Sequence, residues 1–342
     1  MRVLVDISHP SQVHFFKNLI FRFRRNKDKV LVTAREKDVT IDLVRNLNLK
    51  YICLSRQKNG MPAMAWELII RYIRMWAIVR RFKPDILIAE TGVTVGLIGT
   101  ILRIPRIVEE DTEHAKLQRM IGLPFVSIIM TGLGYLGNHG SRERKFKGVW
   151  VQSYLNPEYF TPDASILANA GIDVSKPFIV MRMVSWTAAH DTGLHGYDET
   201  GYLDIIKRLS KYGRVIISSE ETLPESMVQY KNPVAPEQVH HLLAFAHLYI
   251  GEGATMAAEA AVLGTPAIFC NPLPLGYLMA MEKEYQLLYN CKSFSEGIEI
   301  AEKLLNTENL TQLWQQRRQK LLDESEDINE FMYKIVKELV RS

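Results

Sequence analysis

Short apolar runs alternate with stretches of helical periodicity along most of the chain. In the first half the apolar runs cover residues 3–7, 29–33, 51–54, 84–90 and 104–108. In the second half they cover residues 177–182, 213–220, 248–250 and 267–269. Apolar runs of this length separated by helical segments are typical of βα units, whose strands form a parallel sheet with helices on its faces. We therefore predict an α/β fold.

The pattern and the length together predict two domains. The sequence has 342 residues, enough for two sizeable cores, and its 47% hydrophobic and 23% charged residues indicate a globular chain. The alternation breaks between residues 160 and 176, where Pro162 and Gly171 interrupt it. We place an N-terminal domain at residues 1–165, a C-terminal domain at residues 166–325 and a charged helical tail at residues 326–342.

Charge and cysteine content argue against several classes of protein. The formal net charge of +4 is modest and predicts no nucleic-acid partner. The three cysteines are too widely separated for a disulfide framework or a zinc motif. Met1 leads directly into a predicted strand rather than into a signal peptide, and no run approaches the roughly 20 apolar residues that cross a bilayer. We expect a cytoplasmic protein.

The glycine-rich segment at residues 248–264 predicts a binding site for a nucleotide diphosphate. An apolar strand leads to Gly251 and Gly253, which let the backbone approach a ligand closely, and a helix follows. The start of a helix favours phosphate, and the first N–H groups of this one belong to Ala254, Thr255 and Met256. Glu259 lies on the same helix face as Thr255 and would accept hydrogen bonds from ribose hydroxyls. The alternative is a glycine pair that serves only a tight turn.

Strand ends in the first half carry acidic groups. Glu90 ends one predicted strand, and Glu110 and Asp111 follow the next, so we expect all three at one edge of the sheet. His14 lies in the first turn of the helix that follows the first strand, at that same edge. Such groups act as general acid or base, or bind sugar hydroxyls. The alternatives are a solvated acidic loop and a surface or capping role for the histidine.

Polar residues also follow strands in the second half. Arg182 ends the first strand of that half, and Ser219 lies at the end of the next. Ser185 and His190 lie in the loop after Arg182. An arginine grips a diphosphate through paired hydrogen bonds from its guanidinium group, so we expect this loop to bind the nucleotide. A surface salt bridge is the alternative role for Arg182.

One helix combines apolar and basic residues around most of its circumference. Residues 62–82 include Trp66, Trp76 and four arginines. Packing against the sheet is the first interpretation, because crossover helices of parallel sheets are often strongly apolar. Peripheral contact with the inner face of a membrane is the alternative.

Three sequence blocks resemble known proteins. The block GEGATMAAEAAVLGTPAI resembles the donor-binding strand, loop and helix of GT-B-fold nucleotide-sugar enzymes. That group includes UDP-GlcNAc 2-epimerases and the lipid-linked GlcNAc transferase of peptidoglycan synthesis. The blocks MRVLVDISHPSQVHFFKNLI and EDTEHAKLQRMIGLP resemble an uncharacterised archaeal and bacterial domain-of-unknown-function family of this superfamily. The resemblance covers nearly the whole chain.

The resemblance implies both a fold and a ligand. It implies a GT-B-like α/β architecture, in which two Rossmann-like parallel-sheet domains face a cleft that binds a UDP-sugar, and a last helix that crosses back to the first domain. In this superfamily the loop that matches Val234 and Ala235 binds the base through backbone groups, and the loop after Arg182 contacts the diphosphate and sugar. Glu90 and Glu110 lie near the positions of two acidic catalytic residues of the epimerases.

Two enzymatic functions and one binding function follow from these observations. The first is a glycosyltransferase that transfers the sugar to a glycan or lipid-linked acceptor, as in the synthesis of cell-envelope polysaccharide, with Glu110, Asp111 or His14 as the base. We expect metal-independent chemistry, because the sequence contains no metal-ligand cluster or DxD-type motif. The second is a non-hydrolysing UDP-GlcNAc 2-epimerase-like enzyme that uses Glu90 and Glu110 for proton removal and return. The third is a regulatory protein that binds a nucleotide sugar. No cofactor besides the donor substrate is expected, and a homodimer is left open.

Overall fold

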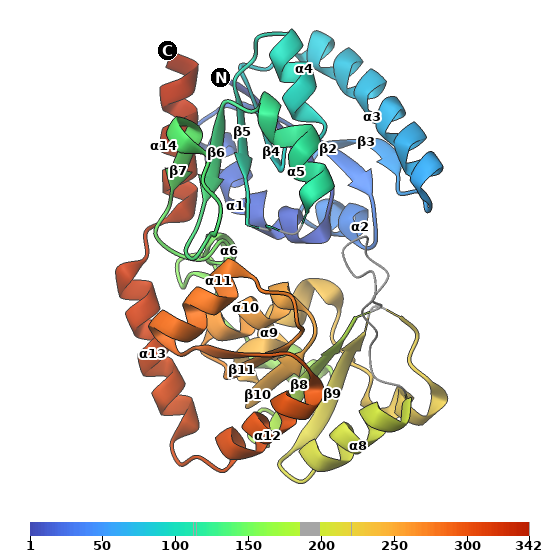
Figure 1. The fold of residues 1–342 in the computed structure, drawn as a ribbon, viewed down its shortest axis with the longest axis vertical. Coiled ribbons are helices and arrows are strands. Elements are labelled where there is room, and N and C mark those ends of the chain that lie inside the picture. The colour runs from blue at the N-terminus through green and yellow to red at the C-terminus, as the bar shows by residue number, and fades with distance from the viewer. Residues whose placement is uncertain (112, 114, 185–198, 220, 342) are drawn as a thin grey trace. The chain divides into compact units, whose positions relative to one another are not determined.

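The chain forms two compact units, each built on its own parallel sheet (Figure 1). The computed structural model describes residues 1–111, 113, 115–184, 199–219 and 221–341. Unit 1 consists of Met1–Tyr154 together with Glu326–Ser342, and unit 2 consists of Leu155–Ser325. The predicted α/β fold class is confirmed.

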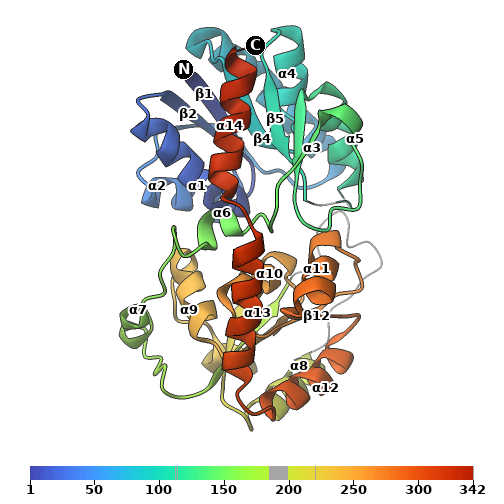
Figure 2. The same ribbon diagram turned by 90° about the vertical axis from the view of Figure 1, so that its left-hand side faces the viewer.

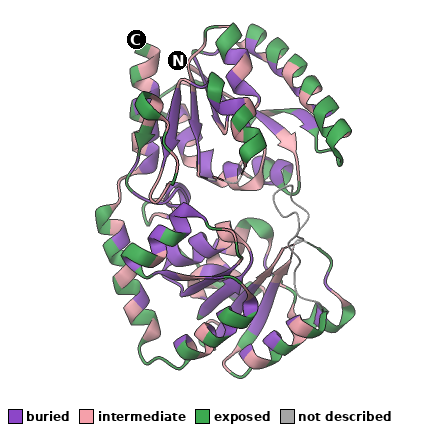
Figure 3. Cartoon of the chain, in the orientation of Figure 1, coloured by how far each residue is buried: buried purple, intermediate pink, exposed green. Residues whose placement is uncertain are grey.

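The sheet of unit 1 has seven strands in the order β3-β2-β1-β4-β5-β6-β7, and every neighbouring pair is parallel. The strands are β1 (Arg2–Ile7), β2 (Lys29–Glu36), β3 (Tyr51–Arg56), β4 (Ile86–Glu90), β5 (Arg106–Glu109), β6 (Ile128–Thr131) and β7 (Glu143–Lys145). The central strands are buried along most of their length (Figure 3). Burial on both faces explains why they appear in the sequence as continuous apolar runs rather than as alternating ones.

Helices cover this sheet. They are α1 (Pro10–Arg25), α2 (Thr40–Asn46), α3 (Met61–Phe82), α4 (Val95–Ile101), α5 (Lys116–Gly122), α6 (Gln152–Leu155, which spans the boundary) and α14 (Ile328–Arg341), with 3-10 turns η1 (Leu123–Phe125) and η2 (Gly140–Arg142). The last helix, α14, lies beside α1 (Figure 2). The ring centroids of Phe23 and Tyr333 are 5.5 Å apart, and Arg22 forms an ion pair with Glu330. The tail therefore belongs to unit 1, although it follows unit 2 in the sequence.

One short strand of unit 1 lies in a segment that the sequence does not mark as a strand. Residues 141–147 are mostly charged, and Glu143–Lys145 within them forms β7, the edge strand that pairs with β6. The hydroxyl of Thr131 donates a hydrogen bond to Glu143 Oε1 at 2.7 Å and helps to hold the edge strand in register. The run is too short and too charged to carry a strand pattern by itself.

The sheet of unit 2 has five parallel strands in the order β12-β11-β10-β8-β9. The strands are β8 (Phe178–Met183), β9 (Arg214–Ser219), β10 (Leu248–Gly251), β11 (Ala267–Cys270) and β12 (Leu288–Cys291). The helices are α7 (Ala164–Asn169), α8 (Glu199–Leu209), α9 (Val239–Phe245), α10 (Ala254–Leu263), α11 (Gly276–Ala280), α12 (Phe294–Leu305) and α13 (Leu310–Glu324). Shorter turns are η3 (Glu225–Tyr230), η4 (Pro236–Gln238) and the π-helical η5 (Met281–Tyr285).

The chain enters unit 2 earlier than the boundary predicted at residue 165. The ring of Phe160 lies 4.8 Å from that of His241, and the backbone N–H of Asp163 donates to His241 Nδ1 at 3.0 Å. These contacts attach the segment after Leu155 to α9 of unit 2. The Pro and Gly residues of this segment mark turns, but the packing partners decide to which unit it belongs.

Candidate functional site

The strand ends of unit 1 bring several carboxyl groups together. β4 ends at Glu90 and β5 ends at Glu109, and these two residues are register partners in neighbouring strands. Glu110 and Asp111 follow directly. Burial raises the pKa of each of the three glutamates, and the charge of Asp111 raises it further, so all four groups lie within electrostatic reach of one another. Three predicted site residues, Glu90, Glu110 and Asp111, therefore share one edge of the sheet.

Glu90 is held largely protonated at neutral pH. Burial raises its pKa from 4.5 to about 8, and the negative charge of Asp111 adds to the shift. A hydrogen bond from the side chain of Gln12 and the positive charge of Lys37 act in the opposite direction. Glu90 keeps part of its surface exposed. A carboxyl group whose pKa lies near the working pH can both accept and donate a proton.

Glu110 and Glu109 lie deeper than Glu90. Burial, followed by the charge of Asp111, raises the pKa of Glu110 to about 9, although Arg119 Nε lies 3.2 Å from its Oε1. Glu110 is fully buried, and neither of its carboxyl oxygens has a hydrogen-bond partner within the described part of the chain. Burial also raises the pKa of Glu109 well above its ordinary value. Proton-carrying carboxyl groups therefore concentrate at this edge.

The histidines of α1 lie at the start of that helix. His9 is the N-cap residue, its Nδ1 lies 2.8 Å from Ser11 Oγ, and burial together with the charge of Lys37 lowers its pKa to about 3, so the ring is neutral. His14, one of the three predicted candidates for the base, has its ring centroid 5.4 Å from that of Tyr154. The role of His14 as a base stays a prediction.

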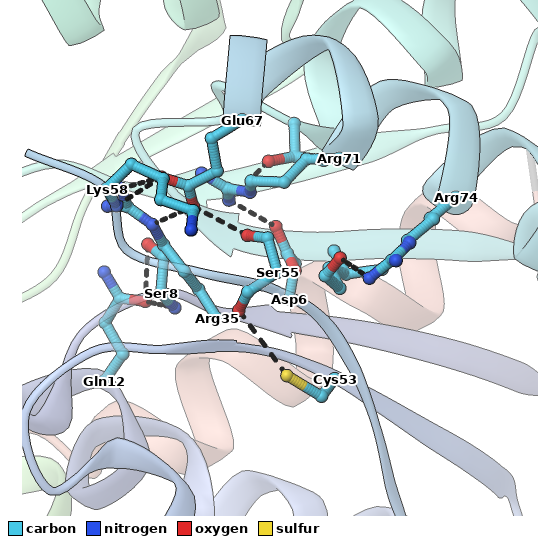
Figure 4. Close-up of polar contacts among 12 residues, drawn as sticks. Asp6, Ser8, Gln12, Arg35, Cys53, Ser55, Lys58, Glu67, Arg71 and Arg74 are labelled. Carbon is cyan, nitrogen blue, oxygen red and sulfur yellow. Dashed lines mark hydrogen bonds and ion pairs between the residues drawn. The ribbon is translucent and has the colours of Figure 1, made fainter. Parts of the chain in front are cut away.

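Gln12 is a site residue that the sequence did not single out. It is almost fully buried, and its Oε1 accepts a hydrogen bond from the backbone N–H of Ser8 at 2.6 Å (Figure 4). Because the amide oxygen is occupied in this way, the amide nitrogen is the group that faces Glu90 as a donor. A glutamine early in an amphipathic helix carries no signal of such a role.

A buried polar network lies beside this edge (Figure 4). Asp6 accepts a hydrogen bond from Thr33 Oγ1 at 2.7 Å, and Arg71 Nη2 lies 3.7 Å from its Oδ2. Burial raises the pKa of Asp6, whereas the charge of Arg71 lowers it. Arg71 also donates to Thr94 Oγ1 at 2.6 Å. The network links β1 and β2 to helix α3, which contributes Arg71.

A second ion pair anchors the start of α3. Arg35 donates from Nε and Nη2 to the two carboxylate oxygens of Glu67, each at 2.7 Å. Ser55 Oγ donates to the same carboxylate at 2.7 Å, and Lys58 donates through its backbone N–H at 3.1 Å (Figure 4). Burial opposes ionisation of Glu67, but these partners together lower its pKa. Glu67 is therefore a fully hydrogen-bonded structural carboxylate rather than a candidate acid.

In unit 2 the glycine turn lies under the side chain of Arg182. A Cβ added at Gly251 would come within 2.6 Å of Arg182 Cβ, and one added at Gly253 would meet Arg182 Cγ at 3.0 Å. The guanidinium group of Arg182 reaches Ser218, and its Nη1 donates a hydrogen bond to Ser218 Oγ at 2.9 Å. The two predicted glycines and the predicted arginine are therefore parts of one packed arrangement at the carboxyl ends of β8 and β10.

Helix α10 begins directly after this turn. Gly253 is its N-cap residue and has no side chain to cap it, and the first backbone hydrogen bond of the helix runs from Ala257 N to Gly253 O at 3.0 Å. The three N–H groups that precede that bond point out of the helix start and belong to Ala254, Thr255 and Met256. The helix ends at Gly264, whose φ of 84° is in the left-handed region.

Glu252, between the two glycines, is a second residue that the sequence did not single out. It is buried, and its carboxylate accepts hydrogen bonds from Val184 N at 3.1 Å and from Tyr202 OH at 3.2 Å. Glu252 thereby fixes the backbone where β8 ends. A lone acidic residue inside a glycine turn resembles a solvent-facing one in sequence, and the two differ only in their tertiary partners.

Glu259, predicted to bind ribose hydroxyls, is 5% exposed and lies inside unit 2. Its Oε1 is 2.9 Å from Nε2 of His240 on α9. The ring of Phe160 packs edge-on against His240 at 6.0 Å. The carboxylate thus links α10 to α9, and ribose binding by Glu259 stays a prediction.

Three further predicted donor residues of unit 2 are Val234, Ala235 and Ser219. Val234 is buried, and its backbone N–H donates to Asn232 Oδ1 at 2.9 Å, whereas Ala235 is the N-cap residue of η4. Ser219 ends β9, and its hydroxyl accepts a hydrogen bond from Glu221 N at 3.1 Å. Two predicted residues, Ser185 and His190, lie outside the described residues.

Sequence comparison places the chain in a family. The family described as "Protein of unknown function (DUF354)" matches residues 1–341. "Uncharacterized protein MJ0665" of Methanocaldococcus jannaschii is 26% identical over 286 residues, which are 80% of this chain and 82% of that protein.

Structural comparison identifies the fold. UDP-GlcNAc 2-epimerase from Neisseria meningitidis, solved with UDP-GlcNAc bound, superimposes with a TM-score of 0.68 at 13% identity and covers 100% of both chains. The Streptomyces sp. SF2575 glycosyltransferase SsfS6, solved with thymidine diphosphate, has a TM-score of 0.63 at 13% identity and covers 98% of this chain and 99% of its own. The chain therefore has the GT-B-like fold that epimerases and glycosyltransferases share, as predicted.

Proposed function

The chain belongs to the DUF354 family, and on that premise we propose that it is a nucleotide-sugar-dependent enzyme, more narrowly a glycosyltransferase that takes a UDP-sugar as donor. The acceptor would be a glycan or a lipid-linked sugar. The observation that carries the proposal is the raised pKa of Glu90, about 8, at a strand end where the fold commonly holds its ligands. A carboxyl group in that range suits proton transfer from an acceptor hydroxyl.

The donor diphosphate would bind in unit 2. Arg182 packs against the glycine turn, and its planar guanidinium group can donate paired hydrogen bonds to a phosphate. The first N–H groups of α10, which begins at the end of the same turn, can donate further hydrogen bonds. Ser219, Val234, Ala235 and Glu259 would make further donor contacts, and so would Ser185 and His190. Fixed donors of this kind stabilise the negative charge that develops on a leaving diphosphate.

The base would be Glu90 rather than Glu110. Both have raised pKa values, but Glu110 is fully buried and lies against Arg119, whereas Glu90 keeps part of its surface exposed. The base is the ionised form of Glu90, which is the minority form at neutral pH and becomes the majority form above about pH 8. In the transfer step the acceptor hydroxyl oxygen forms a bond to the sugar C1 and loses its proton to this carboxylate. The bond between C1 and the diphosphate oxygen breaks, and UDP leaves with the bonding electrons.

A UDP-sugar 2-epimerase is the second candidate, and a specific observation favours it. Glu90 and Glu110 follow neighbouring strands, and both have raised pKa values, so one can act as acid while the other acts as base. Epimerisation needs such a pair, because one group removes the proton at C2 and another returns it on the opposite face. A transferase needs one base and an acceptor.

The test begins with a panel of UDP-sugars without acceptor, followed by NMR, together with thermal stabilisation by UDP. A transferase would be stabilised by UDP and leave the sugar unchanged until an acceptor glycan or lipid-linked sugar is added. A new C2 epimer with intact nucleotide would identify the epimerase instead. If no nucleotide stabilises the protein, the donor site in unit 2 is wrong.

Two variants with matched controls assign the roles. Arg182→Lys should weaken UDP binding about tenfold, because the bidentate grip is lost. Arg214→Lys on the neighbouring strand, where the guanidinium donates to Gly171 O, should leave binding unchanged. Glu90→Gln should lower turnover by about 100-fold or more without weakening UDP binding. Glu158→Gln, at an exposed glutamate, serves as its control.

A further inference from the structure

Helix α3 exposes an apolar face to solvent. Its exposed large hydrophobic residues are Met61, Met64, Trp66, Ile69, Ile73 and Trp76. Trp66, Ile69, Ile73 and Trp76 are spaced by three and four residues, so they form one stripe along the helix. Trp66 is 64% exposed and Ile73 is 65% exposed, which is unusual for such large apolar side chains. Figure 3 shows much of the length of α3 in the colour of exposed residues.

The opposite face of α3 packs against the rest of unit 1. Its buried residues are Glu67, Arg71, Met75 and Val79. Glu67 binds Arg35, and Arg71 lies between Asp6 and Thr94, so these two charged side chains of the helix point inward (Figure 4). Along the first turns the charged side chains are buried and the large apolar ones are exposed, which is the reverse of the usual amphipathic helix. None of the four stripe residues is among the buried residues of α3, so the core of unit 1 does not explain why they are large and apolar.

The charges on this helix all have one sign at the surface. Glu67, the single acidic residue of Met61–Phe82, is 4% exposed and paired, so the exposed side of α3 carries no negative charge. Arg80, Arg81 and Lys83 are exposed at its carboxyl end, directly after the apolar stripe. A surface with tryptophan and isoleucine next to a basic cluster complements an anionic lipid surface, where aromatic rings lie at the headgroup level and cations meet lipid charge.

We propose that the outer face of α3 is a peripheral docking surface for an anionic lipid bilayer, with the helix lying in the plane of the interface. In the part of the chain that the structure describes, no helix is long and apolar enough to cross a membrane, so α3 would lie on the bilayer rather than span it. A second copy of the chain fits less well, because a symmetric contact through this face would offer its basic cluster only the same acid-free surface.

This inference does not depend on the proposed enzymatic function. Vesicle binding by α3 can be measured without any nucleotide sugar or acceptor. Failure of the UDP-sugar assays would leave it standing, and failure to bind vesicles would leave the donor site untouched.

The experiment is flotation of the full-length protein with phosphatidylcholine vesicles, with and without phosphatidylglycerol. We expect the protein to float with the anionic vesicles and to bind neutral ones more weakly, since each basic residue near an anionic surface strengthens binding about fivefold. Tryptophan fluorescence should be quenched by lipids with brominated acyl chains, because Trp66 would insert below the headgroups.

Variants of the stripe decide whether α3 is the contact. The double substitution Trp66→Ser, Ile73→Ser should lower partitioning about tenfold or more, because the apolar area that enters the interface is lost. Val228→Ser, at an exposed apolar residue of η3 in unit 2, should leave partitioning unchanged. Arg80→Ala with Arg81→Ala should remove most of the preference for anionic vesicles and leave the weaker binding to neutral ones. Circular dichroism checks that each variant remains folded, which the exposure of these side chains favours.

Three results would overturn the proposal. One is absence of flotation with either vesicle, and another is flotation that the double variant does not reduce. The third is sedimentation of the wild type as a dimer that the double variant dissociates, with no binding to vesicles, since the stripe would then bind a second copy of the chain.

Discussion

At the scale of single residues, the raised pKa of Glu90 is what marks it as the candidate acid or base. Glu90 ionises near pH 8 in the folded chain, against 4.5 for an ordinary glutamate. Between those two pH values the folded state binds the proton more tightly than the unfolded state does. The contribution of this carboxyl to stability is therefore present below pH 4.5 and is lost progressively as pH rises to about 8.

Replacing Glu90 by glutamine should raise stability at alkaline pH, because glutamine has no charge to bury. We expect the thermal midpoint of Glu90→Gln to exceed that of the wild type by a few degrees at pH 8 and by much less at pH 5. For a protein of this size, a stability difference of about 1 kcal/mol shifts the midpoint by roughly 2–4 °C. Thermal scans across this pH range measure the difference. Glu158→Gln should show no such trend, and a constant difference for Glu90→Gln would mean that its pKa is not raised.

The glycine turn of unit 2 offers a second prediction at this scale. Gly251→Ala would place its Cβ 2.7 Å from the carbonyl oxygen of Arg182, a backbone atom that cannot move alone. We expect a loss of about 1–3 kcal/mol in the free energy of unfolding, measured by chemical denaturation. Gly253→Ala meets side-chain atoms, of which Arg182 Cγ is the nearest at 3.0 Å, and should cost less. Equal costs would argue against the close approach at Gly251.

At the scale of elements, α3 is positioned by its polar residues. Its buried face carries an ion pair with β2, and a hydrogen bond from Arg74 Nη1 to Leu54 O at 2.6 Å adds a contact with β3. This arrangement leaves the apolar stripe facing solvent. Hydrophobic periodicity alone would turn the helix the other way, because it assigns apolar residues to the core.

Breaking the buried pair should cost far more than breaking an exposed one. Glu67→Gln leaves Arg35 with an uncompensated charge where both side chains are mostly buried, so we expect a loss of about 3 kcal/mol by chemical denaturation. Glu36→Gln removes a matched glutamate from an exposed pair with Arg56, whose atoms are 3.6 Å apart, and should cost less than about 0.5 kcal/mol. Similar values for the two variants would show that α3 is not anchored through Glu67.

At the scale of the whole molecule, the chain returns to its first unit at its end. Ser153 O accepts hydrogen bonds from Asn18 of α1 at 2.8 Å and from Asn329 of α14 at 2.7 Å. Lys147 N also donates to Glu326 at 2.7 Å. Unit 1 is therefore completed only after unit 2 has been synthesised.

Two core substitutions, one in each unit, test whether the two units unfold independently. Met332 of α14 is buried in unit 1, and Leu321 of α13 is buried in unit 2. Met332→Ala should lower the local stability by about 2–5 kcal/mol and speed hydrogen exchange in β1 to β6, with little change in β8 to β12. Leu321→Ala should do the reverse. Mass spectrometry of exchanged peptides distinguishes these patterns, and equal acceleration in both units would mean that they open together.

The sequence by itself determined the element types and the position of the glycine turn of unit 2. Apolar runs, helical periods and glycine turns are local signals, so they predicted the α/β class, most strand and helix positions, and the cluster of Glu90, Glu110 and Asp111 at one strand edge. Only the tertiary structure decided which groups surround those residues. Burial, and then the charge of Asp111, raise the pKa of Glu90, whereas Gln12 and Lys37, which lie far away in sequence, lower it. His240, on a different helix, is the partner of Glu259. Burial and pairing are properties of sheet order and packing, which no local pattern contains.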